Sequence, residues 1–100
     1  MKRLKPTNYE VFITSTVNAD VSRSPEMAKA VFDAAWRFSQ GDWGDMCRED
    51  KKYNDCDLRD RDGHVCGRYK TPNGDIYINL VFDEPSIGGD VAVIMYCYEY

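Results

Sequence analysis

The chain has 100 residues, of which 43% are hydrophobic and 30% are charged, and its formal net charge is -4. This size and composition are typical of a single globular domain, and the acidic balance argues against direct nucleic-acid binding. No apolar run approaches the roughly 20 residues that span a bilayer, and the basic start lacks the apolar segment of a secretory signal. We therefore expect no membrane contact and a cytoplasmic location.

The first predicted element is a strand over residues 9–17, YEVFITSTV, in which β-branched side chains alternate between two faces. A helix is predicted over residues 25–39, because Ser24 is a good N-cap and Pro25 suits the first helical position. Its apolar stripe consists of Met27, Val31, Ala34, Ala35 and Phe38, widened by Phe32 and Trp36.

A second, more polar helix is predicted over about residues 46–60, with Asp45 as its candidate cap. Three strands are predicted to follow, over residues 64–70, 75–82 and 91–100, and the Asn73-Gly74 pair indicates a hairpin between the first two. The order β-α-α-β-β-β predicts a single α+β domain over residues 1–100. We expect an antiparallel four-stranded sheet with two helices packed on one face.

The signals for metal or catalytic chemistry are weak. The chain has one histidine and no C-x-x-C spacing, and its Asp-rich segment before Gly63 has Leu58 and Tyr69 where a calcium loop needs oxygen ligands. His64 and Cys66 would share one face of a strand, as a thiol and its base would. We expect no catalytic residues, no metal, no cofactor, and reduced thiols at Cys47, Cys56, Cys66 and Cys97.

The C-terminal third combines tyrosines with carboxylates, and residues 71–100 contain no Lys or Arg. Such a face cannot attract phosphates, whereas tyrosines anchor protein interfaces and carboxylates select a basic partner surface. Tyrosines packed beneath a helix are the alternative interpretation. The predicted partner-binding residues are Tyr77, Asp83, Glu84, Asp90, Tyr96, Tyr98, Glu99 and Tyr100.

The segment GDWGD (41–45) separates the two predicted helices. Gly41 can end the first helix, Asp42 and Asp45 can cap the second, and Trp43 can cover the seam between them. We interpret Gly41, Asp42, Trp43 and Asp45 as a structural junction, with a functional contact loop as the alternative.

The same segment contributes to a family resemblance. GDWGD (41–45), ED (49–50), ND (54–55), G-x-Y (67–69), NG-x-x-x-I (73–78) and the terminal EY (99–100) resemble a family of small uncharacterised proteins from bacterial and phage genomes. The likeness covers about residues 28–100. The final strand, IMYCYEY, departs from the Leu-Pro-rich ending of that family.

The resemblance implies a mobile-element protein of a bacterial host, and several such proteins are anti-CRISPR proteins, including inhibitors of Cas9. We therefore expect a non-enzymatic inhibitor that binds a basic nucleic-acid-binding groove of a Cas effector, of Cas9 type, and blocks loading of guide RNA or DNA. Two alternatives stay open. One is an antitoxin-like or structural protein-binding module, and the other is a small metal-dependent hydrolase that uses the carboxylates of residues 42–57.

Overall fold

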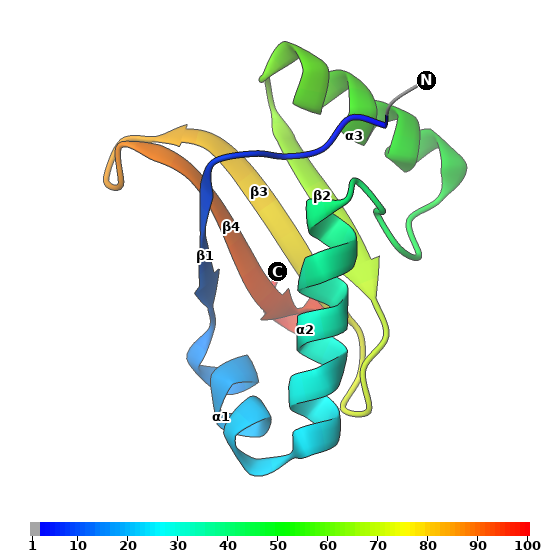
Figure 1. Cartoon of the computed structure of the whole chain (residues 1–100), viewed down its shortest axis with the longest axis vertical. Coiled ribbons are helices and arrows are strands. Elements are labelled where there is room, and N and C mark those ends of the chain that lie inside the picture. Colours follow the sequence, from blue (N-terminus) through cyan, green and yellow to red (C-terminus); the bar gives the residue numbers. More distant parts are fainter. Residues whose placement is uncertain (1–2) are drawn as a thin grey trace.

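Four strands form one sheet in the computed structural model, which describes residues 3–100. Their order across the sheet is β1-β4-β3-β2 (Figure 1). The strands are β1 (Tyr9–Ile13), β2 (His64–Tyr69), β3 (Ile76–Glu84) and β4 (Gly89–Tyr96). The α+β class is confirmed. The prediction of a fully antiparallel sheet is wrong, because β1 lies beside β4 and runs parallel to it, while β2, β3 and β4 pair antiparallel.

Within residues 3–100 there are three α-helices where two were predicted: α1 (Ser15–Arg23), α2 (Pro25–Ser39) and α3 (Arg48–Asp60). α2 has the predicted bounds, and the Ser24 hydroxyl oxygen accepts a hydrogen bond from Met27 N at 3.1 Å. α3 begins after Cys47, which makes no side-chain cap hydrogen bond, so the prediction that Asp45 caps this helix is wrong. α2 covers one sheet face, whereas α3 lies against β2 at the edge of the sheet (Figure 1).

α1 takes the last three residues of the strand predicted over residues 9–17. Thr14 makes the turn: its N donates to Ile94 O at 3.0 Å, and its hydroxyl oxygen accepts from Val17 N at 3.4 Å. Val17 is then fully buried as the first turn of α1 begins. The β-branched residues here fit a strand equally well, and a nine-residue helix with one buried side chain shows little periodicity.

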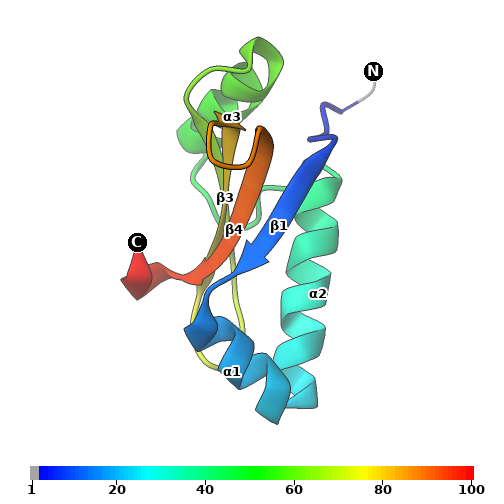
Figure 2. The same ribbon diagram turned by 90° about the vertical axis from the view of Figure 1, so that its left-hand side faces the viewer.

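The last strand is also shorter than predicted. β4 ends at Tyr96, and Cys97–Glu99 form a short 3-10 helix, η1. The Glu99 carboxylate accepts hydrogen bonds from Tyr96 N at 2.9 Å and from Thr14 Oγ1 at 3.0 Å. These contacts end the strand, and the C-terminal residues lie on the sheet face opposite α2 (Figure 2).

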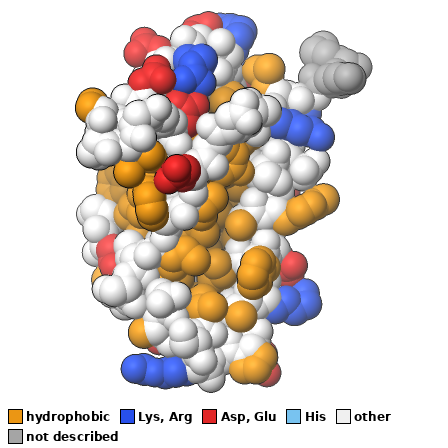
Figure 3. Space-filling model, turned by 60° about the vertical axis from the view of Figure 1, so that its left-hand side comes forward, with side chains coloured by type: hydrophobic (Ala, Val, Ile, Leu, Met, Phe, Trp, Pro, Cys, Tyr) orange, Lys and Arg blue, Asp and Glu red, His pale blue; other side chains and the backbone are white. Residues whose placement is uncertain are grey.

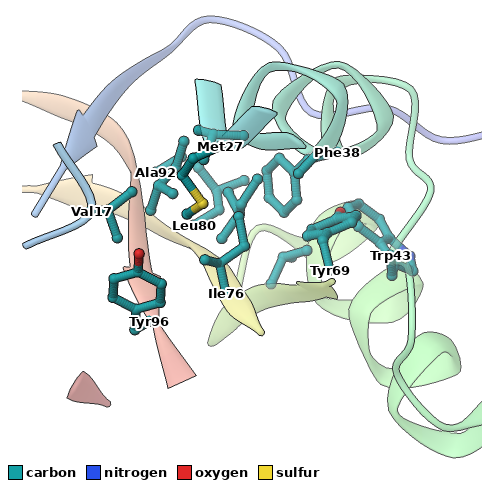
Figure 4. Close-up of a cluster of buried hydrophobic side chains, with 14 residues drawn as sticks. Val17, Met27, Phe38, Trp43, Tyr69, Ile76, Leu80, Ala92 and Tyr96 are labelled. Atoms are coloured by element: carbon teal, nitrogen blue, oxygen red, sulfur yellow. The ribbon is translucent and has the colours of Figure 1, made fainter. Parts of the chain in front are cut away.

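The apolar core lies between α2 and the sheet (Figure 4). On β3, Ile76, Ile78 and Leu80 are buried in this core, and the alternate residues face the other side of the sheet. Its largest fully buried side chains include Trp43, Tyr69, Tyr96, Phe38 and Met27. The GDWGD segment and the last strand therefore both supply core residues.

Candidate functional site

The GDWGD segment covers the outer edge of β2. Arg68 N donates to Trp43 O at 3.1 Å, and Asp45 N donates to Arg68 O at 2.7 Å. Gly44 has a φ of 70°, and a Cβ atom at this position would lie 2.0 Å from Arg68 O, so this close approach requires glycine. Since an uncovered sheet edge exposes unpaired backbone groups, the segment serves as a short extra strand.

Asn54 of α3 continues this cover. Its Nδ2 donates to Cys66 O at 2.7 Å, and its Oδ1 accepts from Cys66 N at 3.1 Å. The side-chain amide therefore pairs with the backbone as a neighbouring strand would. Sequence reasoning missed this role. The available signal was an uncharged amide in an otherwise heavily charged helix, and Asn54 is the residue of α3 that is buried.

Trp43 lies between α2 and α3. Its ring is fully buried and meets Phe38 of α2 edge-on, with 5.3 Å between ring centroids. Its Nε1 donates to Asp55 Oδ1 of α3 at 2.9 Å. The buried indole thus contacts both helices, and its polar atom has a partner, as burial requires.

Asp42 closes the turn after α2 and does not cap α3. Its carboxylate accepts from Arg37 Nε at 2.7 Å and from Gly44 N at 2.9 Å, and the Arg37 contact lowers the pKa of Asp42 below its ordinary value. Its backbone oxygen accepts from the Tyr69 hydroxyl at 2.6 Å. Gly41, with a φ of 77°, ends α2 where a Cβ atom would lie 2.2 Å from Leu4 O.

The predicted partner-binding residues do not share one surface. Tyr96 was expected to be exposed, but it is buried, and its hydroxyl donates to an Asp20 carboxylate oxygen of α1. Burial raises the pKa of Tyr96 to about 12. Tyr98 is exposed and stacks on the Tyr96 ring at 5.2 Å. The prediction that the last strand runs to Tyr100 is wrong, because β4 ends at Tyr96.

Several of the predicted acidic residues have partners within the chain. Asp90 is 7% exposed and accepts from Arg61 Nη1 at 2.8 Å, and Arg61 Nη2 also donates to Asp83 at 3.2 Å. Glu84 accepts from the Ser86 hydroxyl at 3.1 Å. These carboxylates hold turns and strand ends together, so they do not form one acidic face.

The pair of Asp90 and Arg61 makes stability depend on pH. The hydrogen bond from Arg61 lowers the pKa of Asp90 below its ordinary value of 3.8 in the folded chain. The stabilisation that this ion pair contributes is fully present above the pKa of Asp90 in the unfolded chain. It is lost as the pH falls through the lower pKa of Asp90 in the folded chain. We expect Asp90→Asn to lower the free energy of unfolding clearly at pH 7 and much less near pH 3. Urea denaturation at both pH values measures this, and an equal loss at both would contradict it.

Tyr77 and Tyr100 meet in a pocket between α3 and the sheet face opposite α2. The pocket has a volume of about 260 Å³. The Tyr77 and Tyr100 rings pack edge to face at 5.5 Å, and Tyr53 of α3 adds a third ring. We call this the acidic tyrosine pocket. Its lining residues are Met46, Asp50, Tyr53, Asn54, Asp57, His64, Cys66, Tyr77 and Tyr100.

Asp50 and Asp57 give this pocket its negative charge. Neither carboxylate forms an ion pair with any residue of the described range 3–100, and none of the lining residues is Lys or Arg. Arg68 lies outside, 6.0 Å from the centre of the Tyr77 ring, and it is bound to Asp75 at 2.8 Å. Aromatic faces beside carboxylates attract an ammonium or guanidinium group.

His64 and Cys66 line the same pocket, yet their chemistry does not favour nucleophilic attack. Burial raises the pKa of Cys66 to about 12, so its thiol is protonated at neutral pH and lacks the reactive thiolate form. The thiol donates weakly to Gly67 O at 3.8 Å. Among the carboxylates of residues 42–57, Asp42, Asp45 and Asp55 lie at the junction, whereas Asp50 and Asp57 line the pocket. Among the residues that the structure describes, no group of three or more His, Cys, Asp or Glu is arranged to hold a metal.

A second surface feature is an apolar groove of about 300 Å³ between β1 and α2, visible in Figure 3 as a hollow among hydrophobic side chains. Phe32 and Trp36 were predicted to widen the core stripe of α2, but they are 73% and 66% exposed. They lie too far around the helix to reach the core. We call this feature the β1–α2 groove, and it is lined by Val11, Ile13, Val21, Ala28, Val31, Phe32, Ala35 and Ile94.

Comparisons with protein-family models, with curated proteins and with solved structures find no match to this chain. The resemblance to small mobile-element proteins therefore stays a prediction. In the described range, no helix combines the length and the apolar character needed to cross a bilayer.

Proposed function

We propose that this chain is a non-enzymatic protein-binding module that accepts a basic side chain of its partner in the acidic tyrosine pocket. The observation that carries this proposal is the meeting of three tyrosine rings and two carboxylates around one pocket that, among residues 3–100, no Lys or Arg lines. Each ring–cation contact contributes about 0.5–2 kcal/mol, more when water is excluded. The carboxylates add charge selectivity, so a basic partner is favoured over a neutral one.

The dimensions of the pocket suit a side chain better than a free cofactor. Small-molecule sites usually enclose about 300–1,000 Å³, and this pocket, at about 260 Å³, is smaller. Tyr53 and Tyr100 are 66% and 70% exposed, so a protein partner can cover them from outside. Exposed tyrosines around a central pocket are typical of residues that dominate protein interfaces.

A Cas effector of Cas9 type is the specific partner that we propose. Its guide and DNA channels are strongly basic, and residues 71–100 of this chain contain no Lys or Arg. The motif resemblance supports the same partner. Since Asp83, Asp90 and Glu99 are engaged within the chain, the expected contact is no longer one acidic face of the C-terminal third but the acidic tyrosine pocket. Occupying the basic groove would block loading of guide RNA or DNA.

Reversing the pocket charges tests both parts of this proposal. We expect the double variant Asp50→Lys/Asp57→Lys to bind purified Cas9 at least about 30-fold more weakly than the wild type. The control is Asp33→Lys, a single charge reversal on exposed α2 that we expect to leave binding unchanged. Binding is measured with and without guide RNA. No binding by the wild type in either state would remove Cas9 as the target.

An antitoxin-like or structural module with another partner is tested by the same variants. If the partner is another protein, affinity purification from the bacterial host should capture a basic protein with the wild type and with Asp33→Lys. The double variant should lose it. A partner that the double variant retains at full strength would show that the acidic tyrosine pocket is not the binding site.

A further inference from the structure

The two edges of the sheet differ. The edge formed by β2 is covered by residues 43–45 and by Asn54, whereas β1 is the terminal strand on the other side (Figure 2). Thr14 N donates to Ile94 O, so the backbone N–H of Thr14 points toward β4. Because the backbone N–H and C=O groups of successive residues point to opposite sides of a strand, those of Val11 and Ile13 point away from β4. Within residues 3–100, no hydrogen bond from outside the sheet reaches either residue.

This open edge lies beside the β1–α2 groove. Val11 and Ile13 are about half exposed, and the neighbouring Phe32 and Trp36 of α2 project further. Charged residues and proline are the usual features that protect an edge strand from pairing. β1, YEVFI, has only one charged residue and no proline, so it is weakly protected. A strand added here would gain backbone hydrogen bonds and cover apolar side chains at the same time.

We infer that a second copy of this chain occupies this edge, with the two β1 strands antiparallel and centred on Val11. In this register Val11 faces its own counterpart and Tyr9 faces Ile13. These are the residues whose backbone groups point outward, so each facing pair exchanges two hydrogen bonds. The two four-stranded sheets join into one, and the β1–α2 grooves of both copies meet across a two-fold axis.

The side chains favour a second copy over a charged partner. All residues that line the β1–α2 groove are apolar, so the surface that covers it has to be apolar as well. In the register centred on Val11, Glu10 faces Phe12, whereas a register centred on Glu10 would set two carboxylates against each other. Phe32 and Trp36 of each copy then lie over the β1 strand of the other, where they are shielded from water.

The oligomeric state of the full chain tests this inference independently of the acidic tyrosine pocket. Analytical ultracentrifugation from about 1 to 200 µM should show a monomer–dimer equilibrium for the wild type. Val11→Pro removes an outward N–H while the ladder to β4 keeps its donors. Trp36→Glu places a charge beside the shared grooves. Both variants should raise the dimer dissociation constant at least about tenfold.

Tyr98→Glu is the control, because Tyr98 is an exposed aromatic residue like Trp36 but lies in η1 and lines neither the β1–α2 groove nor the acidic tyrosine pocket. It should dimerise like the wild type. Circular dichroism shows whether each variant is folded, and if Val11→Pro does not fold, the exposed Trp36→Glu decides the outcome. A wild type that stays monomeric over the whole range overturns the inference. Unchanged dimerisation of both interface variants, or equal weakening by the control, also overturns it.

Discussion

Replacing Trp43 with alanine is expected to lower the free energy of unfolding by about 3–5 kcal/mol, the range for a large aromatic truncated in a packed core. Trp43 is fully buried, meets Phe38 of α2 edge-on and donates to Asp55 of α3. Its loss leaves a cavity between two helices and removes the hydrogen bond to Asp55. Since a domain of this size has about 5–15 kcal/mol in total, this single change removes a large share of the stability.

The chain contains its own matched control, because its second tryptophan, Trp36, is 66% exposed on α2. Trp36→Ala should change the free energy of unfolding by less than about 1 kcal/mol in urea denaturation. Both variants are compared at a protein concentration that keeps the wild type monomeric. A loss below about 1 kcal/mol for Trp43→Ala would contradict the view that the GDWGD segment is a structural junction.

Gly44→Ala is expected to cost about 3–4 kcal/mol, although it adds one methyl group. A left-handed backbone costs a residue with a Cβ atom about 1–2 kcal/mol, and Gly44 has a φ of 70°. The new Cβ would lie 2.0 Å from Arg68 O, so the segment must move away from β2. That movement breaks the two backbone hydrogen bonds of Arg68, each contributing about 1 kcal/mol.

Gly88 separates the two contributions, because it has a similar φ of 80° with no atom within 4 Å of its added Cβ. Gly88→Ala should therefore cost only the backbone strain, about 1–2 kcal/mol. Thermal or urea unfolding of both variants gives the difference. If the two losses are equal, the contact between residues 43–45 and β2 contributes nothing to stability.

The long elements could be predicted from the sequence because local signals agree there. α2 combines Ser24, Pro25 and a regular apolar stripe, and it occupies Pro25–Ser39 as predicted. β2 and β3 are flanked by clear turn residues. α1 could not be predicted because Thr14 and Val17 favour a strand locally, and the cap contact that starts the helix is visible only in the fold.

The arrangement of the sheet depends on contacts between distant residues, which no local pattern encodes. The parallel pairing of β1 with β4 joins the two ends of the chain. The end of β4 depends on Glu99, whose carboxylate binds Thr14 and the backbone of Tyr96. The sequence therefore suggested one continuous strand over residues 91–100, although β4 ends at Tyr96 in the core and Tyr100 lies on the opposite face of the sheet.

The candidate site could be predicted only in part, because it too depends on contacts between residues that are distant in the sequence. Tyr77 and Tyr100 were proposed as partner-binding residues, and they do line one pocket. Asp50, Asp57 and Tyr53 were not assigned to that site, because α3 looks like an ordinary charged surface helix in the sequence. Only its position beside β2, fixed by Asn54, brings these side chains to the tyrosines.

The acidic tyrosine pocket is tested most directly by an NMR titration of the isotope-labelled full chain with N-acetyl-arginine amide. We predict saturable shifts at Tyr53, Tyr77 and Tyr100, lost in the double variant Asp50→Lys/Asp57→Lys and kept in Asp33→Lys. Shifts spread evenly over exposed carboxylates such as Glu10 and Asp83, or no shifts at all, would contradict a pocket built for a basic side chain.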